Sequence, residues 1–482
     1  MTAYQTIDEL TSGAGKQLES FLRNRKWEVT QKKQPDLEAY EQELHRQMQE
    51  IQRNVMAAKL QEFDVDAEAI IVDGVSCMEA DESEEEYMTT AGTVRVNRHM
   101  YRPAGRGTRH VCPLEMRAGI VARFYTPLAA KQAAYLMALL PAKGAAELFE
   151  QLGGMAPSEA SLTRLPKLLS TRWETKRLEW EEQMRQEELM PKGAATVAIS
   201  LDGVMAPLRA SERKQAANKP ATAAEAVAVT ATPKQPKGPK GYQEIGCGTV
   251  SLYDADGERL QTVRYARAPE KHKATLGQQL KAEVSHIFSE QPKLRLVKLA
   301  DGAKTNWSFL SELDVGIPNE QLQVYEILDY YHACTHLKTA LDATWGECSV
   351  KGRSEFERLK LLLKESDLGI QIVIDHLRYR LRTATGKGER KTLTEQLGYF
   401  RNQRERMRYS EYIRLNLPIA SGVVEASCKT LVAQRLKQSG MLWSRGGAQA
   451  ILTLRALIQS DRWETGWKLL RASYQFPIAI SA

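Results

Sequence analysis

Two short runs of apolar residues, 195–204 and 294–299, have the composition of strands that are buried on both faces. Each run ends in an Asp-Gly pair, at Asp202 in the first and at Asp301 in the second. A single Asp-Gly pair most often only begins a turn. Two pairs at the ends of buried strands would hold carboxylates rigidly, and their glycines would leave room for a phosphate to approach. Such an arrangement suits metal-dependent phosphoryl transfer.

The pattern around these runs predicts the rest of a sheet. Further strands are expected at 244–253, 260–265 and 323–328, and helices at 272–289 and 307–313. The order is therefore strand, strand, strand, helix, strand, helix, strand. This is the order of a ribonuclease-H-like domain, in which the first and fourth strands are neighbours. We predict an α/β catalytic core with a mixed sheet that brings Asp202 and Asp301 together.

The region before this core has a mainly helical pattern. From residue 36 to residue 55, apolar residues recur at spacings of three and four. Their seam is close to a heptad repeat, so this helix either pairs with a second copy of the chain or packs on its own domain. Strands are expected at 69–75 and 93–98, with the acidic run 79–86 between them as a solvated loop.

A second helical stretch, 126–152, stops at Gly153-Gly154 and is followed by a helix with Ser158 as its cap. Helix, glycine turn and capped helix resemble a helix-turn-helix, although many helical hairpins share the pattern. The basic residues between 98 and 110 fit either phosphate contact or an ordinary wet hairpin. We expect this region to bind DNA.

These patterns divide the chain into five parts. We expect an N-terminal helical region at 1–68, a small DNA-binding region at 69–190, the first part of the core at 191–329, a helical insertion at 330–415, and the rest of the core with the C-terminal helices at 416–482. Within the core, residues 208–241 are rich in Ala, Lys, Pro and Thr. Such a segment cannot bury a hydrophobic core, so we expect it to be mobile.

Composition narrows the class of protein. The net charge of +7 is mildly basic, so a nucleic-acid surface should be local. The six cysteines include no Cys-x-x-Cys pair, which argues against a zinc ribbon or a disulfide framework and suits a reducing compartment. The chain shows no membrane-length apolar window and no signal peptide at its start. We therefore expect a cytoplasmic protein.

The back half of the helical insertion has a strong excess of positive charge. Residues 376–414 hold eleven Lys or Arg and four Glu. The aromatic residues that alternate with the arginines are Tyr379, Tyr399, Phe400, Tyr409 and Tyr412. This mixture suits phosphate contact with base stacking, and the alternative is a solvated helical face. Arg401, Arg404 and Arg408 are the candidates for DNA contact.

A third carboxylate follows the insertion. Glu425 falls in the first turn of an expected helix, where the helix dipole favours negative charge. Lys429, Arg435 and Lys437 form a positive strip beyond it, and Trp443 follows the strip. We expect these four side chains to contact DNA.

The sequence resembles bacterial insertion-sequence transposases of the ISKra4 family, which are DDE enzymes. The matching segments are 418–432 (Pro-Ile-Ala-Ser-Gly-Val-Val-Glu-Ala-Ser-Cys-Lys-Thr-Leu-Val), 434–444 and 447–456, with further likeness at 112–121 and 153–167. The resemblance implies that Asp202, Asp301 and Glu425 are the DDE triad. It also implies that the helical region is a known kind of insertion and that Asp329 and His332 form an Asp-x-x-His signature near the active site. The segment 208–241 is less typical of the family.

The three carboxylates imply two Mg²⁺ ions, with Mn²⁺ as a substitute, because hard cations take oxygen ligands. Two ions about 3.5–4 Å apart would need carboxylates about 4 to 8 Å from one another. His332, Cys334 and His336 bring zinc to mind, but no fourth ligand has suitable spacing and Cys334 would leave the histidine face. Zinc is therefore not expected; a polar cluster near the active site or a contact with single-stranded DNA fits these residues better.

We therefore expect a DDE transposase that cuts the ends of an insertion sequence and transfers the 3′ hydroxyl strands to target DNA by two-metal phosphoryl transfer. Its partners would be double-stranded DNA, at the transposon ends and the target, and further copies of the chain in a homodimer or larger assembly. Two alternatives are a catalytically inactive, transposase-derived DNA-binding protein and a ribonuclease-H-like nuclease without strand transfer.

Overall fold

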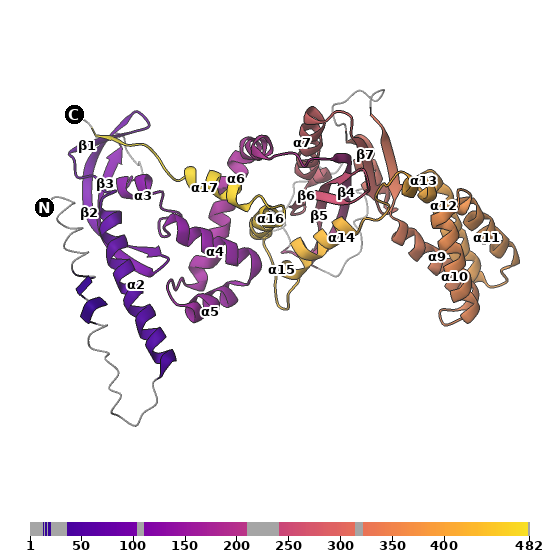
Figure 1. Ribbon diagram of the computed structural model, residues 1–482, viewed down its shortest axis with the longest axis horizontal. Coiled ribbons are helices and arrows are strands. Elements are labelled where there is room, and N and C mark those ends of the chain that lie inside the picture. Colours follow the sequence, from indigo (N-terminus) through magenta and orange to yellow (C-terminus); the bar gives the residue numbers. More distant parts are fainter. Residues whose placement is uncertain are drawn as a thin grey trace, which may run out of the picture. The chain divides into compact units, whose positions relative to one another are not determined.

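The computed structural model describes residues 36–103, 110–209, 241–313 and 322–480, with a few positions between 13 and 20. Most of the segment 208–241 and part of the basic stretch 98–110 lie outside the described residues, so the expected mobility of that segment stays a prediction. Contacts divide the chain into two compact units, residues 1–180 with 463–482, and residues 181–462 (Figure 1). Residues 416–482 were expected to hold the rest of the core and the C-terminal helices, and the last part of this range, 463–482, belongs to the first unit.

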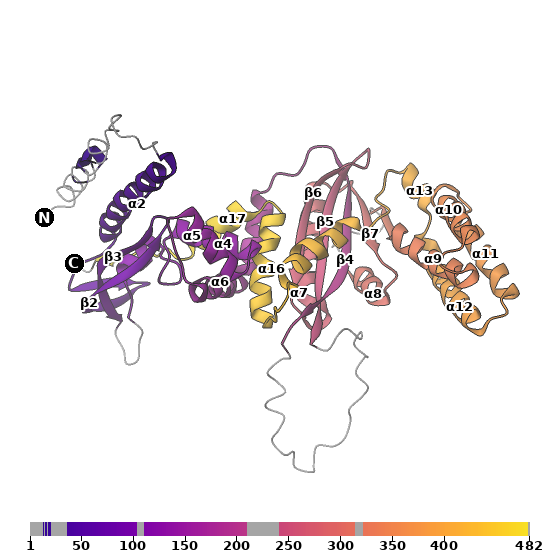
Figure 2. The ribbon, with the colours of Figure 1, turned by 90° about the horizontal axis from the view of Figure 1, so that it is seen from below.

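The first unit is mainly helical and contains one small antiparallel sheet. Its strands are β1 (Ala69–Val72), β2 (Val75–Thr89), β3 (Gly92–Pro103) and β9 (Ala479–Ile480), in the order β3-β2-β1-β9. Its helices are α2 (Leu37–Gln61), α3 (Pro113–Ala118), α4 (Pro127–Leu139), α5 (Ala142–Leu152), most of α6 (Glu159–Glu187) and α17 (Trp463–Ala472). Helix α2 packs against β3 (Figure 2). Leu37, Met48 and Val55 remain exposed on α2, so its pairing with a second copy stays a prediction.

The acidic run 79–86 belongs to β2, and the expectation of a solvated loop was wrong. Acids of this run form ion pairs across the sheet with basic residues of β3. Glu85 pairs with Arg98, and Glu86 lies 2.7 Å from Arg95 Nη2. Opposite charges on facing strands stabilise a sheet. The charge of this segment alone therefore predicted its secondary structure wrongly, because the compensating charges lie on the neighbouring strand.

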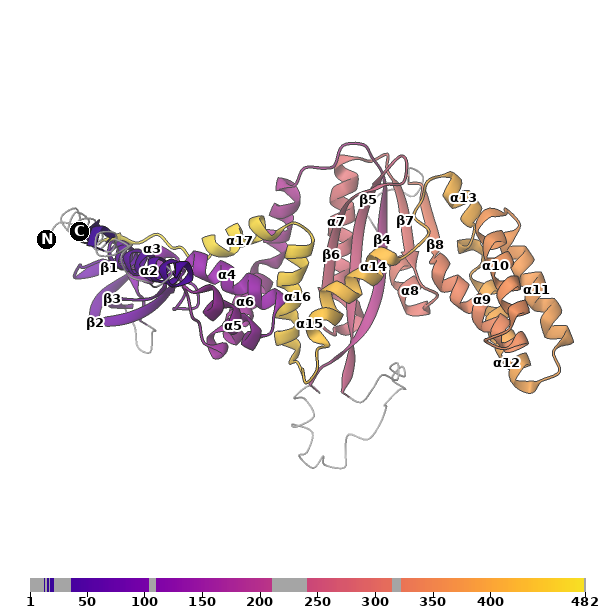
Figure 3. The ribbon, with the colours of Figure 1, turned by 60° about the horizontal axis from the view of Figure 1, so that its bottom comes forward.

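The second unit contains the expected mixed sheet. Its strands are β4 (Ala194–Pro207), β5 (Tyr242–Asp254), β6 (Arg259–Arg267), β7 (Arg295–Ala300) and β8 (Val324–Leu328), in the order β6-β5-β4-β7-β8 (Figure 3). The first three strands are antiparallel, and β4, β7 and β8 are parallel. The first and fourth strands are neighbours, as predicted, and the core is ribonuclease-H-like.

Helices bury both faces of this sheet. The helices outside the insertion are α7 (Ala274–Glu290), α8 (Lys304–Glu312), α14 (Gly422–Ser427), the π-turn Cys428–Ala433, α15 (Gln434–Leu436) and α16 (Arg445–Gln459). Leu276, Leu280 and Val284 of α7 join one hydrophobic core. Leu431 and Ile451 belong to a second core. Burial on both faces explains why the strands are continuous apolar runs instead of alternating ones.

The insertion is helical, as predicted. It comprises α9 (Tyr330–Trp345), α10 (Val350–Glu365), α11 (Gly369–Thr383), α12 (Lys387–Asn402) and α13 (Tyr409–Arg414). Phe400, Tyr409 and Tyr412 are buried, so the expectation that they stack on bases was wrong. The hydroxyl of Tyr409 donates to the Leu328 carbonyl at 3.0 Å, and that of Tyr412 to the Glu326 carbonyl at 3.3 Å. These aromatic residues fix the insertion to β8.

Candidate active site

The two predicted aspartates lie on neighbouring strands, but only Asp301 follows the end of its strand. Asp202 was expected to end its strand; instead it lies within β4, which stays paired with β5 as far as Pro207. β4 and β7 run parallel, and their paired residues continue as far as Ser200 opposite Leu299. Asp202 and Asp301 each come two residues later, so they occupy matching positions on adjacent strands, which are about 4.8 Å apart in a sheet. Both residues are half-buried. The fold therefore brings these two carboxylates to one edge of the sheet.

Local donors orient each aspartate. Asp202 Oδ1 accepts the backbone N–H of Gly203 at 2.7 Å. Asp301 Oδ1 accepts the N–H of Ala303 at 3.1 Å and the side-chain amide of Asn306 at 3.0 Å. Side chains held in this way are already oriented before a ligand binds.

Glu425 comes from a helix that is tied to β4. It lies in the first turn of α14, which contacts β4 and β5. The helix continues into the π-helical segment Cys428–Ala433, a feature frequent at functional sites. There the Cys428 thiol lies 3.5 Å from Asp202 Oδ2. A hydrogen bond with Cys247 and burial raise the pKa of Cys428. The thiol therefore stays protonated and donates to Asp202.

The pKa of Asp202 is raised above its ordinary value. Burial is the largest cause, and the hydrogen bond from Gly203 opposes it. The negative charges of Asp301 and Glu425 raise this pKa further. Like charges have this effect only at short range, so the three acids share one electrostatic neighbourhood.

The chemistry of this donor set fits magnesium, which prefers carboxylate oxygens. Within the described ranges, however, no three His, Cys, Asp or Glu side chains converge closely enough to hold a metal ion. The exposed carboxylate of Glu425 instead accepts the hydroxyl of Ser421 at 3.0 Å. The ligand types are suitable, and the expected carboxylate separations stay a prediction.

Asp329 supports the helix that carries Glu425. Its carboxylate is buried and accepts two backbone N–H groups, from His332 at 2.6 Å and from Ser421. Ser421 is the N-cap of α14, and its hydroxyl donates to Glu425. Asp329 thus links the end of β8 to the glutamate helix, at a distance of 92 residues along the chain.

Side chains of the insertion reach the surroundings of Asp301. The ring of His336 stacks on that of Tyr399 with 3.6 Å between their centres, and the ring of His332 is 5.4 Å from that of His336. Burial raises the pKa of Tyr399, and the charge of Asp301 adds to the effect. The buried Tyr399 hydroxyl has no hydrogen-bond partner among the described residues. Tyr399 is therefore next to the site instead of on a DNA-facing surface.

The glycines after the two aspartates lie against neighbouring side chains. A Cβ on Gly203 would lie 2.2 Å from Glu244 Oε1, and a Cβ on Gly302 would lie 2.3 Å from Tyr399 Cε2. The Tyr399 ring is rigid, so position 302 needs glycine, whereas the flexible Glu244 side chain can move away from position 203. The room expected for a phosphate at these glycines stays a prediction.

Five of the seven residues expected to contact DNA are exposed, namely Arg401, Arg404, Arg408, Lys429 and Lys437. Arg404 pairs with Glu405 at 3.0 Å and Arg408 with Glu411 at 3.3 Å. Exposed pairs of this kind contribute little stability, so both guanidinium groups can exchange their partners for phosphates.

Arg435 and Trp443 are located differently. The side chain of Arg435 is buried, with its guanidinium 5.0 Å from the centre of the Trp443 ring. Burial lowers the pKa of Arg435 to about 10, and the charge of Arg455 adds to the effect. The Trp443 indole donates to the Leu436 carbonyl at 3.1 Å. The two side chains therefore pack against each other within the protein and do not form a DNA-contacting surface.

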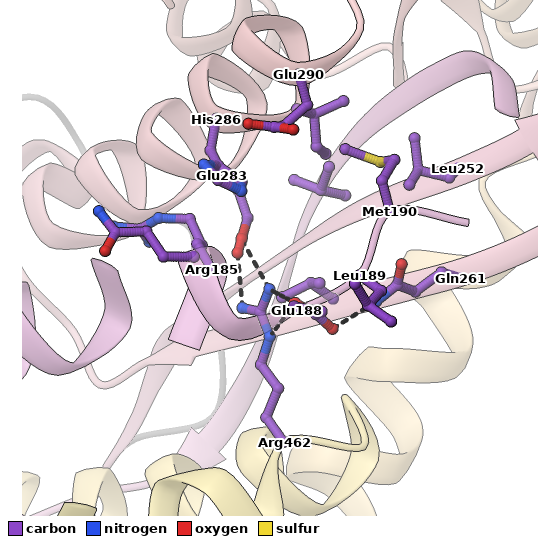
Figure 4. Close-up of a pocket in the computed structure, with 14 residues that line it drawn as sticks. Arg185, Glu188, Leu189, Met190, Leu252, Gln261, Glu283, His286, Glu290 and Arg462 are labelled. Atoms are coloured by element: carbon purple, nitrogen blue, oxygen red, sulfur yellow. Dashed lines mark hydrogen bonds and ion pairs between the residues drawn. The ribbon is translucent and has the colours of Figure 1, made fainter. Parts of the chain in front are cut away.

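A second polar cluster lies between α7, β5, β6 and the end of α6 (Figure 4). Arg462 Nη1 is 2.6 Å from Glu283 Oε1, and its Nε donates to Glu188 at 3.0 Å. The cavity beside them, about 290 Å³, is lined on its other sides by apolar residues such as Met190 and Leu252. Because each of these charges faces one of opposite sign, this cluster is structural.

Comparisons with known proteins give little. No family model and no curated protein matches the chain. A chain of the solved Drosophila P element transposase strand transfer complex is similar in structure. The alignment covers 68% of this chain and 91% of that chain, at 10% sequence identity and a TM-score of 0.32. A likeness this low carries no information on family or activity. In the described part of the chain, no helix is long and apolar enough to cross a membrane.

Sequence analysis missed Ser421, Cys428 and Asn306 and gave Tyr399 a different role. Ser421 offered a signal, since a serine just before a helix is a typical N-cap. Cys428 offered none, because its contact depends on the approach of α14 to β4. Tyr399 was noticed for its aromatic ring, but its direction is set by the docking of α12.

Proposed function

We propose that this protein is a DDE transposase of the ISKra4 family, which cuts insertion-sequence ends and joins them to target DNA. The observation that carries the proposal is the matching position of Asp202 and Asp301 on adjacent parallel strands, with the Glu425 helix tied to Asp202. Fold alone would be compatible with many activities. Carboxylates gathered at one place, in contrast, repel one another unless they bind protons or a cation.

Asp202, Asp301 and Glu425 would hold Mg²⁺ or Mn²⁺. Two such ions, when bound, activate the attacking oxygen and stabilise the leaving oxygen of an in-line displacement at phosphorus. The protein supplies orientation: backbone and Asn306 donors fix the aspartates. Asp329, through Ser421, positions the glutamate helix.

Exposed basic residues would bind the DNA backbone. Arg401, Arg404 and Arg408 lie on the insertion, and Lys429 and Lys437 follow Glu425. Contacts of this type with phosphates are independent of base sequence and weaken as salt rises. They would hold DNA across the sheet edge during both cleavage and joining.

The test is nicking of supercoiled plasmid by the full-length protein in Mg²⁺, Mn²⁺ or EDTA. We expect nicking in either metal and none in EDTA. Asp202→Asn, Asp301→Asn and Glu425→Gln should each abolish nicking and keep DNA binding, because they remove a ligand charge with little change in shape. Asp375→Asn, at an exposed acid paired with Arg378, is the matched control and should stay active.

The products separate the alternatives. Joined plasmid molecules support a transposase, whereas nicking without joining supports the ribonuclease-H-like nuclease. DNA binding without nicking in any metal supports an inactive, transposase-derived DNA-binding protein. A fully active variant at one of the three acids would remove that residue from the assignment.

A further inference from the structure

A basic cavity lies near Asp202 and Asp301, two of the three acids. It has a volume of about 430 Å³ and is lined by β4, β5, the loop between β6 and α7, and the start of α16. Four basic side chains line it: Arg267, Lys271, Lys273 and Arg445. Two carboxylates complete its charged lining.

Both carboxylates are engaged within the protein. Glu244 forms an ion pair with Lys273 at 3.0 Å. Glu270 accepts the backbone N–H of Leu276, in the first turn of α7, at 2.9 Å. With twice as many basic as acidic groups, the cavity favours an anionic ligand.

The cavity is connected to the catalytic acids. Its lining includes Gly246, which pairs across the sheet with Gly203, the residue after Asp202. Lys273 Nζ lies 3.4 Å from Asn306 Oδ1. The amide of Asn306 in turn donates to Asp301. A ligand in the cavity would therefore lie beside the bond that the acids act upon.

The backbone that presents Lys273 is strained. His272 and Lys273 have φ values of 54° and 49°, in the left-handed region that residues other than glycine rarely adopt. Such conformations persist only where the surrounding structure imposes them, and they concentrate at functional sites. The loop holds the Lys273 ammonium between Glu244 and Asn306.

The remaining lining is largely apolar. It includes Met205, Tyr242, Pro269 and Leu276. A lining that combines cations with apolar side chains matches a nucleotide unit, whose phosphate is charged and whose sugar and base offer less polar surfaces. A free inorganic anion would not need the apolar side chains.

We propose that this cavity binds the phosphodiester adjacent to the one that is cut. Lys271, Lys273 and Arg445 contact its phosphate, and the sugar lies against Met205 and Tyr242. The identity of the ligand as DNA rests on the proposed function. The cavity adds a binding site for the strand beyond the three acids and the exposed arginines of the insertion.

A lysine footprint on the wild-type protein tests the site without cleavage. The protein is acetylated in EDTA with and without a 20-nucleotide single-stranded oligodeoxynucleotide, and each lysine is followed by mass spectrometry. We expect DNA to protect Lys271 severalfold. Lys281, exposed on α7 but absent from the cavity lining, should be unchanged.

Salt-dependent binding of the same oligonucleotide gives a second measurement. Lys271→Ala with Arg445→Ala changes two exposed side chains, so the fold should be preserved. We expect binding to weaken by on the order of tenfold at 0.1 M salt, and the log–log salt slope to fall by about 0.7 per lost contact. The control is Lys281→Ala with Arg46→Ala, an exposed arginine of α2, and it should bind like wild type.

The results separate this proposal from the function on which it rests. If Lys271 is unprotected and the salt slope unchanged while wild type nicks plasmid, the cavity proposal fails alone. If Lys271 is protected but no metal supports nicking, the proposed activity fails and the cavity still binds DNA. Wild type that does not bind DNA would overturn both.

Discussion

Two of the charged clusters in the second unit differ in how their charges are combined. Around Arg462, opposite charges face one another, since Glu283 lies at 2.6 Å and Glu188 at 3.0 Å. Asp202, Asp301 and Glu425, in contrast, all carry negative charge. Among the described residues, no Lys or Arg forms an ion pair with Asp202, Asp301 or Glu425, and Lys273 reaches Asp301 only through Asn306.

The difference separates a structural cluster from a functional one. A buried charge with opposite partners holds its elements together, and removing one partner is costly because the others remain buried. Charges of one sign repel, and their protonation becomes easier unless a cation arrives from outside. Removing a charge from the Arg462 cluster should therefore destabilise the folded protein. Removing one from the three acids should stabilise it.

The largest effect is expected for Arg462→Met. This change leaves Glu188 and Glu283 without their cation, so the free energy of unfolding should fall by about 3–5 kcal/mol. Denaturant titration measures the loss. The control is Arg378→Met, which breaks an exposed pair with Asp375 and should cost less than about 1 kcal/mol. Equal losses in the two variants would contradict a structural role for the Arg462 cluster.

Asp329→Ala should have an intermediate effect. The backbone N–H groups of His332 and Ser421 would each lose an acceptor, at about 1–3 kcal/mol per buried donor. Nicking should fall by about 10–100-fold, as for other residues that orient a metal ligand. Asp329→Asn keeps one acceptor oxygen and should lie between wild type and alanine. A loss of stability without a loss of nicking would show that Asp329 does not position Glu425.

Asp202→Asn should change the free energy of unfolding the least, and it should raise this free energy where the other two changes lower it. Because the pKa of Asp202 is raised on folding, its stability contribution is complete below the ordinary pKa of 3.8 and is lost as pH rises through the folded pKa. Asparagine never ionises, so the variant should melt higher than wild type at neutral pH. The gain should disappear as pH falls to 3.8.

Added Mg²⁺ gives a further test of the difference between wild type and Asp202→Asn. A ligand that binds only the folded state raises stability with its concentration. Millimolar Mg²⁺ should therefore raise the melting temperature of wild type more than that of Asp202→Asn. An equal response would place the bound ion elsewhere.

The sheet and two of its acids were predictable because their signals are local. The apolar runs identify the buried strands, and the element order then makes Asp202 and Asp301 neighbours. The Asp-Gly pair marks the end of β7, whereas β4 continues beyond Asp202 to Pro207. The errors concern contacts between distant segments. The acids of β2 are compensated by the next strand, and Asp329 bonds a serine far along the chain. Tyr409 was assigned to a DNA-binding surface because a sequence does not show which helix face docks on β8.

The docking of the helical insertion limits how this protein can be divided. Phe400, Tyr409 and Tyr412 lie in the same hydrophobic core as the strands. Deleting residues 330–415 would strip β8 of its cover and expose Ile327 and Leu328 to water. The insertion therefore cannot be removed or transferred by itself: shortened versions of the protein should keep residues 181–462 together, and chimaeras with related proteins should exchange them as a whole.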